Sequence, residues 1–324
     1  MNKSSESIRE TVREGYAAIA EAETSCCSGA SCCGSSPEVA RDLAVKLGYD
    51  PKILETLPEG TNLGLSCGNP QAIAELQLGE VVLDLGSGAG FDVFLAAQAV
   101  GPEGFAIGVD MTAQMLSKAR RNAVVFTERT GLDNVEFRLG EIEHLPVADM
   151  SVDVVISNCV LNLSPDKEQV WDEIGRVLVP GGRVAISDLA LRKPLPAGVF
   201  DLAEALVGCV AGAALVEEIH EAAEAAGLVE IVIELKPQYV TAMENMQDPV
   251  YRRIKELLPA GHELSDYIVS ASVTAHMPCE GCDGNCDCGG HADESADPSE
   301  AEARNAAGSC CGEFGDVASG KACC

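Results

Sequence analysis

Three cysteines stand apart from the other thiols of this sequence, because each lies alone in the part of the chain able to fold. Cys67 lies in LSCGNP, Cys159 in SNCVLNL and Cys209 in VGCVAGA. Cys159 and Cys209 have no cysteine nearby at disulfide or zinc-finger spacing. A lone cysteine on an apolar segment is often a small core residue, so packing is one interpretation. The other is thiol chemistry, since thiolates bind soft metals and metalloids.

The remaining cysteines form two clusters. One follows the pattern CC-x4-CC within TSCCSGASCCGSS and consists of Cys26, Cys27, Cys32 and Cys33. The other lies in residues 279–324 and consists of Cys279, Cys282, Cys286, Cys288, Cys310, Cys311, Cys323 and Cys324. That segment has almost no large apolar side chains, so we expect a disordered tail unless it binds metal. Its C-x2-C-x3-C-x-C run, which begins at Cys279, is compact enough to bind a soft ion, but zinc is weakly supported without a paired C-x2-C pattern.

Charge and hydropathy exclude several classes of function. The chain has 324 residues and a formal net charge of -29, which repels phosphate backbones and anionic lipid, so we expect no nucleic-acid partner. The amino terminus, MNKSSESIRE, is polar, and no apolar run approaches the ~18 residues of a membrane helix. We therefore expect a cytoplasmic protein without a membrane partner, in which most thiols are reduced.

The central part of the chain alternates strand and helix patterns. The expected strands are Val81–Gly86, Phe105–Asp110, Val135–Glu141, Val152–Cys159 and Gly182–Leu189. The expected helices are Asp92–Val100, Thr112–Arg129 and Asp166–Leu178, the last ended by Pro180-Gly181-Gly182. This alternation predicts an α/β fold, a doubly wound parallel sheet with helices on both faces and a site at the carboxyl ends of the strands.

After Pro196 the pattern changes to two Ala/Glu-rich helical stretches, strands at Val229–Leu235 and Tyr267–Ala275, and a helix near Asp248–Leu258. We expect the two strands to extend the sheet in antiparallel fashion and the helices to form a lid. The predicted organisation is an N-terminal helix and Cys-rich segment (1–38), a nucleoside-binding domain (39–195), a smaller C-terminal α+β substrate and lid region (196–278) and an acidic Cys-rich tail (279–324).

A glycine-rich loop follows the first predicted strand in VVLDLGSGAG. Asp84, Gly86, Gly88 and Gly90 form D-x-G-x-G-x-G, in which glycine lets the backbone turn sharply and approach a ligand closely. The spacing differs from the G-x-G-x-x-G of nicotinamide-binding proteins. It favours S-adenosylmethionine as the cofactor.

The next two strand ends carry further candidate contacts. The second strand ends in GVDM, where Asp110 can accept hydrogen bonds from both ribose hydroxyls and Met111 follows it. The third ends in GEIEHLP, where Glu141 can accept from an adenine amino group and the Ile142 backbone N–H can meet a ring nitrogen. An isolated surface acid is usually only solvated, but three contacts at successive strand ends favour a nucleoside site.

From Val12 to Ala275 the sequence resembles the S-adenosylmethionine-dependent arsenite methyltransferases. The motifs are LSCGNP, VLDLGSGAGFD, GVDMT, SNCVLNLSPDK, PGGRVAISD and CVAGA. The resemblance implies a Rossmann-like methyltransferase fold of class I. It also implies that Cys159 and Cys209 bind trivalent arsenic, that Cys67 joins them, and that an N-terminal cysteine, Cys32 or Cys33 in our assignment, pairs with Cys67 during turnover.

The chemistry agrees with these residue types. Arsenic(III) is soft and forms pyramidal three-thiolate complexes that keep a lone pair, and that lone pair attacks a sulfonium methyl group without needing a proton acceptor. We therefore expect a methyltransferase whose substrates are arsenite and methylarsenite and whose cysteines are restored by a thiol reductant such as thioredoxin or glutathione. Two alternatives stay open: a methyltransferase for a small organic acceptor, and a non-catalytic protein that binds soft metals.

Overall fold

The computed structural model describes residues 4–21, 37–202, 205, 207, 209–245 and 248–279. The chain divides into two units, Met1–Gly281 and Cys282–Cys324. The N-terminal cluster Cys26–Cys33 and the predicted tail beyond Cys279 lie outside the described residues.

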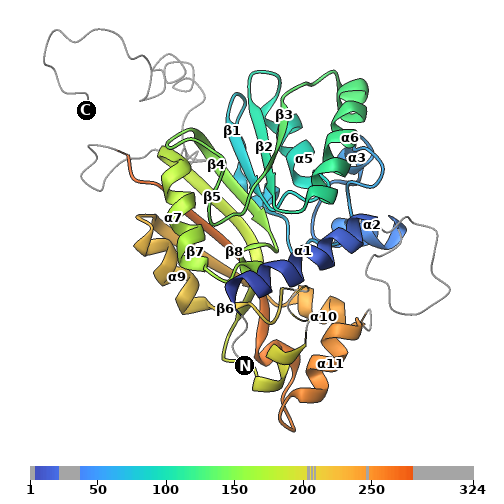
Figure 1. The fold of residues 1–324 in the computed structure, drawn as a ribbon, viewed down its shortest axis with the longest axis vertical. Coiled ribbons are helices and arrows are strands. Elements are labelled where there is room, and N and C mark those ends of the chain that lie inside the picture. The colour runs from blue at the N-terminus through green and yellow to red at the C-terminus, as the bar shows by residue number, and fades with distance from the viewer. Residues whose placement is uncertain are drawn as a thin grey trace, which may run out of the picture. The chain divides into compact units, whose positions relative to one another are not determined.

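The fold is built on one mixed sheet with the strand order β3-β2-β1-β4-β5-β8-β7 (Figure 1). The first five strands are parallel, as predicted, whereas β8 runs antiparallel to β5 and β7 antiparallel to β8. The expectation that the two late strands extend the sheet is therefore confirmed. The strands are β1 (Val81–Leu85), β2 (Phe105–Asp110), β3 (Val135–Leu139), β4 (Val152–Asn158), β5 (Leu178–Leu191), β6 (Ala214–Leu215, beside β5), β7 (Val229–Lys236) and β8 (Ile268–His276).

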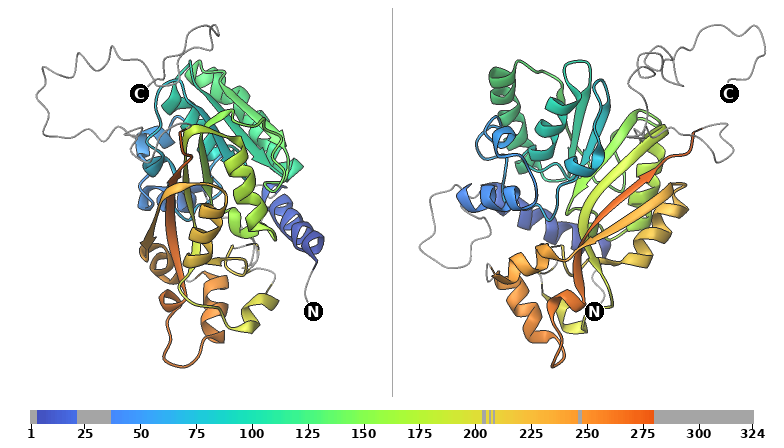
Figure 2. Two further views of the ribbon diagram at one scale, coloured as in Figure 1. Left: turned by 90° about the vertical axis from the view of Figure 1, so that its left-hand side faces the viewer. Right: turned by 180° about the vertical axis from the view of Figure 1, so that it is seen from behind.

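Helices cover both sides of this sheet (Figure 2). They are α1 (Ser5–Glu21), α2 (Pro37–Lys46), α3 (Pro51–Leu54), α4 (Gln71–Ala74), α5 (Phe91–Val100), α6 (Ala113–Thr130), α7 (Lys167–Val177), α9 (Val216–Ala225), α10 (Gln238–Asn245) and α11 (Pro249–Leu257). Short 3-10 turns η1 (Leu161–Leu163), η2 (Ala197–Asp201) and η3 (Leu264–Asp266) join them. Within the described ranges, none of the helices is long and apolar enough to cross a membrane.

Helix and strand ends follow local capping chemistry. Asp166, expected inside a helix, precedes α7 as its N-cap and accepts from the backbone N–H of Gln169. Pro180-Gly181-Gly182, expected to end that helix, lies within β5 instead, because α7 already ends at Val177. The pairing of β4 with β5 shifts register beside this segment, and Gly181 has a φ of 82°, which a β-bulge accommodates through glycine.

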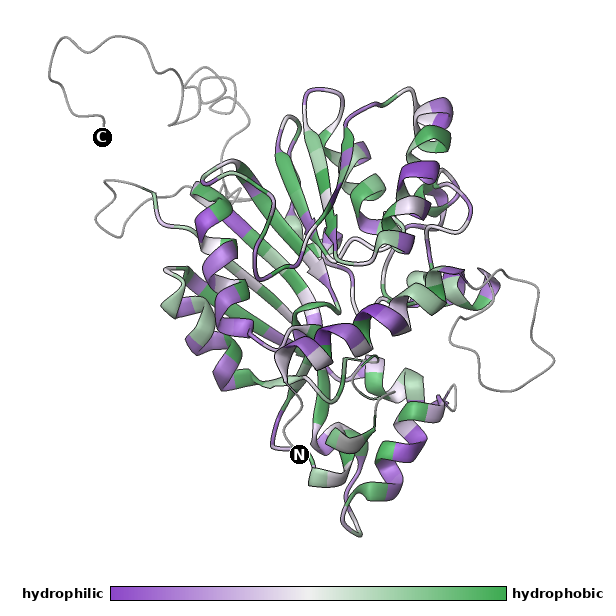
Figure 3. Cartoon of the chain, in the orientation of Figure 1, coloured by the Kyte–Doolittle hydropathy of each residue, from purple (hydrophilic) through white to green (hydrophobic). Residues whose placement is uncertain are grey.

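Side chains alternate between the two faces of the sheet along each strand, and this builds two apolar layers. In β1, Leu83 and Leu85 contribute to the core beneath α7 and α9, whereas Val82 packs with α5 and α6 on the opposite face. Figure 3 shows apolar residues along the strands and polar residues on the outer helix surfaces. Burial on both faces is what a parallel sheet requires.

A third apolar cluster lies at the carboxyl ends of the parallel strands. It combines residues of α1, α10 and α11 with Cys67, Cys159 and Cys209. Residues 196–278, predicted to form a separate substrate region, therefore contribute both strands to the common sheet and helices to the cluster around the cysteines.

The aromatic core between α5, α6 and β3 allows a test of the fold. Phe94 is fully buried and its ring lies 4.8 Å from Phe126 and 5.6 Å from Phe137, between ring centroids. We expect Phe94→Ala to lower the free energy of unfolding by about 3–5 kcal/mol, because it removes apolar contacts and leaves a cavity. Urea denaturation measures this, with Leu78→Ala as the control, since Leu78 is 81% exposed. Equal effects of the two substitutions would contradict the assigned core.

Candidate functional site

The turn between β1 and α5 has the geometry of a ligand-binding loop. Gly86, Gly88 and Gly90 have φ values of 69°, 52° and 93°, in the left-handed region that disfavours other residues. A Cβ at Gly88 would have no atom within 4 Å, so this side of the loop is open. A Cβ at Gly90 would meet Phe94 and Phe137, so that glycine serves the packing of the loop on the core.

Asp110, at the carboxyl end of β2, is bonded to this loop. Its Oδ2 accepts from the backbone N–H of Gly88 (2.9 Å) and its Oδ1 from that of Thr112 (2.7 Å). Burial raises the pKa of Asp110, an effect that these N–H groups oppose. The carboxylate therefore lies in a dry position beside the open side of the loop.

A small cavity of about 70 Å³ is lined by Asp84, Gly86, Gly88, Asp110 and other residues, among them Cys159. The buried hydroxyl of Ser87, in the same lining, has no hydrogen-bond partner. An unsatisfied donor, a glycine loop and a buried acid fit the hydroxyl-rich nucleoside of S-adenosylmethionine. Four of the eight residues predicted at the cofactor thus line one cavity.

The other predicted cofactor residues are not among those that line this cavity. Glu141 forms ion pairs with Arg9 (3.5 Å) and Arg13 (3.1 Å), both on α1. Ile142 is buried in the core beneath α7, and Met111 packs against the cluster that holds the cysteines. Like Gly90, these three residues are absent from the described lining of the small cavity, so their proposed contacts stay predictions.

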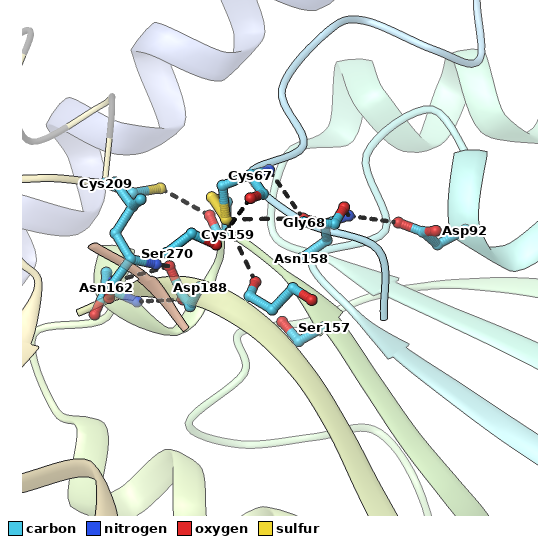
Figure 4. Close-up of a disulfide and its surroundings, with 12 residues drawn as sticks. Cys67, Gly68, Asp92, Ser157, Asn158, Cys159, Asn162, Asp188, Cys209 and Ser270 are labelled. Carbon is cyan, nitrogen blue, oxygen red and sulfur yellow. Dashed lines mark hydrogen bonds between the residues drawn. A yellow bond between two sulfur atoms is a disulfide. The ribbon is translucent and has the colours of Figure 1, made fainter. Parts of the chain in front are cut away.

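The three isolated cysteines converge at the carboxyl end of β4, beside Ser187 and Asp188 of β5. Cys67 and Cys159, 92 residues apart in sequence, form a disulfide, and Sγ of Cys209 donates to the carbonyl oxygen of Cys159 at 2.7 Å (Figure 4). Their exposed fractions are 1%, 6% and 3%. Segments far apart in sequence therefore bring three thiol-bearing residues into one dry site.

Cys67 is bonded to Cys159 in this structure, and its predicted pairing with an N-terminal cysteine is not tested. Cys32 or Cys33 was predicted to pair with it during turnover, but both lie outside the described residues, and in this structure the bond joins Cys67 to Cys159. Two residues predicted to bind arsenic together are thus close enough to bond to each other.

Both Cys159 and Cys209 have left-handed backbone conformations, with φ values of 59° and 63°. Such conformations cost about 1–3 kcal/mol for residues with a Cβ and concentrate at functional sites. Gly212 lets the Cys209 segment approach η1, since a Cβ there would clash with the carbonyl oxygen of Asn162. The backbone is therefore held in unusual conformations at two of the three cysteines.

Asn158 fixes the position of Cys67. Its Oδ1 accepts from the Cys67 backbone N–H (3.2 Å), and its Nδ2 donates to the Gly68 carbonyl oxygen (3.1 Å) and to Asp92 Oδ2 (3.2 Å). The Ser270 hydroxyl donates to the Cys67 carbonyl oxygen (3.0 Å). The loop of Cys67 is thus tied to β4 and β8.

Asp188 lies beside the sulfur atoms. One carboxylate oxygen of Asp188 and the sulfurs of Cys67 and Cys159 all lie within 4.8 Å of one another. Asn162 Nδ2 donates to Asp188 Oδ1 (2.8 Å). Burial raises the pKa of Asp188 to about 6, and burial together with the charge of Asp188 raises the pKa of the Cys209 thiol well above its ordinary value. Cys209 is therefore a protonated thiol at neutral pH in this state.

Comparison with known proteins identifies the family. A family model described as a methyltransferase domain matches residues 76–227. An arsenite methyltransferase of Halobacterium salinarum is 46% identical over 281 residues, which are 84% of this chain and 67% of that protein. The chain belongs to the arsenite methyltransferase family.

Two further comparisons agree. An arsenite methyltransferase of Aquipseudomonas alcaligenes is 39% identical over 56% of this chain and 51% of its own length. The crystal structure of an arsenic(III) S-adenosylmethionine methyltransferase from Chlamydomonas reinhardtii superposes with a TM-score of 0.55 at 30% identity, covering 76% of each chain. The predicted Rossmann-like methyltransferase fold and S-adenosylmethionine as the cofactor are confirmed.

Sequence reasoning missed the polar residues that position the thiols of this methyltransferase. Asn158, Tyr49, Asp92 and Ser270 were not among the predicted site residues. Tyr49 donates to Asp92 Oδ1 (2.9 Å), so the two form the buried support of Asn158. The adjacency of Asn158 to Cys159 was the one available signal.

Asp92 gives this methyltransferase a pH-dependent stability. Burial raises the pKa of Asp92 from 3.8 to about 6, opposed by hydrogen bonds from Tyr49, Asn158 and Gln71. A raised folded-state pKa means that the folded protein binds the proton more tightly than the unfolded chain does. Proton binding by Asp92 therefore adds to the free energy of unfolding; this contribution is full below the unfolded pKa and is lost as pH rises through about 6.

Between about pH 5 and 7.5, loss of the Asp92 contribution should lower the free energy of unfolding of the wild type by about 1.4 kcal/mol, the equivalent of one pKa unit. Asp92→Asn lacks the titrating carboxyl group, so we expect its free energy of unfolding to fall less over the same range, by that amount. Urea denaturation at both pH values measures the difference. Asp133→Asn, at an exposed position, is the control and should keep the wild-type slope. A wild-type slope in Asp92→Asn would contradict the raised pKa.

Proposed function

We propose that this protein transfers methyl groups from S-adenosylmethionine to arsenite and methylarsenite held by Cys67, Cys159 and Cys209. The observation that carries the proposal is the position of Cys159. It is bonded to Cys67, accepts from Cys209 and also lines the cavity of the glycine loop. Thiol chemistry and cofactor binding therefore meet at one residue.

The arrangement suits an in-line methyl transfer. The cofactor supplies an electrophilic sulfonium methyl group, and pyramidal arsenic(III) presents its lone pair on the side opposite its sulfur ligands. The protein contributes orientation, which supplies up to about 7–11 kcal/mol of a barrier reduction when both reactants are fixed. A buried site also keeps water away from the methyl donor.

Arsenic can bind to protonated thiols without a strong base to remove their protons. Each As–O bond of arsenous acid is replaced by an As–S bond, and the leaving hydroxide takes the thiol proton and departs as water. The raised pKa of Cys209 is compatible with this exchange, because the thiol proton leaves with the oxygen.

The disulfide between Cys67 and Cys159 must be reduced before both residues bind arsenic. Reduction takes two electrons and two protons and yields two thiols, so the proposed cycle needs a thiol reductant such as thioredoxin or glutathione. We place the protein in the cytoplasm, where such reductants are maintained. A role for Cys32 or Cys33 in relaying the exchange to Cys67 remains part of this proposal.

Single cysteine variants test the ligand set by counting valences. Arsenite takes three thiolates, whereas methylarsenite has one valence on carbon and takes two. We expect Cys159→Ser and Cys209→Ser to abolish methylation of both substrates, because a serine alkoxide is hard and scarcely populated at neutral pH. Cys67→Ser should impair methylation of arsenite and spare methylarsenite.

The measurement is the rate of each methyl transfer, with arsenic species separated by chromatography in the presence of a thiol. Cys279→Ser is the control, because Cys279 lies outside the cluster that holds the three cysteines. Equal loss of both reactions in Cys67→Ser would place Cys67 with the other two ligands. Methylation of an organic acceptor but not of arsenite would favour a methyltransferase for organic acceptors. Binding of several soft metal ions without any methyl transfer would favour a non-catalytic metal-binding protein.

Asp110 tests the cofactor site separately. We expect Asp110→Ala to weaken S-adenosylmethionine binding by roughly 2–3 kcal/mol, because charge-assisted hydrogen bonds contribute ~1.5–3 kcal/mol each and water compensates in part. Asp153→Ala is the matched control, since its carboxylate accepts from the Val81 backbone N–H (2.7 Å) at the opposite end of β1. Calorimetry should show unchanged affinity for that variant. Unchanged affinity in folded Asp110→Ala would remove Asp110 from the site.

A further inference from the structure

A second and much larger cavity, of about 680 Å³, lies between α7 and α9. Its floor is formed by β5 and β8, through residues such as Ile186 and Val273. None of its lining residues belongs to the glycine loop of residues 86–90. The cavity is therefore distinct from the one expected to hold the cofactor.

The inner end of this cavity reaches the thiol site. Asn162 and Asp188 belong to its lining, and an oxygen of Asp188 lies within 4.8 Å of the sulfurs of Cys67 and Cys159. Figure 4 shows both polar residues beside Cys209 and the disulfide. The three cysteines themselves do not line the cavity, so these two side chains separate it from the sulfur atoms.

The reaction geometry makes a second opening necessary. The cysteines are almost fully buried, and the small cavity beside Cys159 is the one proposed above for the methyl donor. Because the arsenic lone pair must face the sulfonium, the donor blocks that side once bound. Arsenic must then reach and leave the thiols from another direction.

The charge of the large cavity indicates what can enter it. Six carboxyl groups and one amino group lie in its lining: Asp166, Glu168, Asp172, Asp188, Glu218, Glu221 and Lys167. Such a lining repels oxyanions such as phosphate. Arsenous acid is neutral near pH 7 and carries three hydroxyl groups, so it enters without charge repulsion and donates hydrogen bonds to carboxylates.

We propose that the cavity between α7 and α9 is the entrance through which neutral trivalent arsenic acids reach the cysteines, passing Asn162 and Asp188. This inference rests on the proposed function, and it adds the route and the selectivity of that site. Substrate and cofactor then approach the thiols from different sides and do not compete for one opening.

Narrowing the entrance tests the route. Ala222 lines the cavity from α9, and Ala222→Phe places a ring in it. The reduced full-length protein is mixed with arsenite for timed intervals and desalted rapidly, and bound arsenic is determined by mass spectrometry. A chase with a dithiol gives the release rate. We expect association and release both to slow by about tenfold with unchanged equilibrium affinity, within the range over which association rates vary among variants.

His220→Phe is the matched control, because His220 lies on the same helix, is exposed and is not part of the lining. Both variants should keep the wild-type affinity for S-adenosylmethionine, which also shows that they are folded. Wild-type association in Ala222→Phe would overturn the proposal, as would a loss of equilibrium affinity without slower association. A wild-type protein that binds no arsenite would refute the proposed function instead.

Charge reversal tests the selectivity. Glu168 and Glu221 face the cavity from α7 and α9. In the double variant Glu168→Lys and Glu221→Lys, inorganic phosphate should slow arsenite association several-fold, whereas in the wild type it should have no effect. The same insensitivity to phosphate in both proteins would refute electrostatic selection at this entrance.

Discussion

The amide of Asn158 is the interaction on which the site depends. It joins the last residue of β4 to the loop of Cys67 through hydrogen bonds that use both its oxygen and its nitrogen. Asp92 and Tyr49 keep that nitrogen satisfied in a dry environment, where an unpaired polar group costs about 1–3 kcal/mol. Because Asn158 directly precedes Cys159, fixing its side chain also fixes where the next sulfur lies relative to Cys67.

This dependence explains why the cysteines meet without a local sequence pattern. Cys67 precedes the sheet, Cys159 follows β4, and Cys209 belongs to the segment after η2. At Cys159 and Cys209 the backbone is left-handed, and this conformation directs each sulfur toward the common space. The surrounding packing must offset its cost in free energy. The arrangement thus depends on tertiary contacts and not on spacing.

The sequence predicted the parts of the structure that have local causes. The strand, glycine loop and helix around Gly86–Gly90 were predicted because glycine conformations and apolar alternation are local properties. The convergence of the three cysteines was anticipated only through family resemblance. The partners of Glu141 were unpredictable, because Arg9 and Arg13 belong to a helix far earlier in the chain. Arg13 donates to Glu141 over a separation of 128 residues, and Arg9 donates to the nearby Glu143 over 134 residues. The bulge at Gly181 was missed because Pro-Gly-Gly is equally compatible with a helix end and with an irregular strand.

Helix α1 links these long-range contacts to cofactor entry. It crosses the edge of the sheet where the parallel strands end, and its Tyr16 lines the small cavity (Figure 1). That cavity, at about 70 Å³, is far below the ~300 Å³ at the lower end of small-molecule sites, so a nucleoside fits only if its walls separate. The ion pairs of α1 with Glu141 involve side chains that are 17–32% exposed, and exposed pairs of this kind contribute only about 0–1 kcal/mol each. Arg9 also pairs with Glu143, whose side chain is only 5% exposed, and Val12 of α1 is fully buried in the cluster around the cysteines. Widening the cavity on the α1 side therefore breaks a buried ion pair and apolar contacts as well as the weak pairs with Glu141, whereas the opposite walls, built from β1 and β2, are fixed by the pairing of these strands in the sheet.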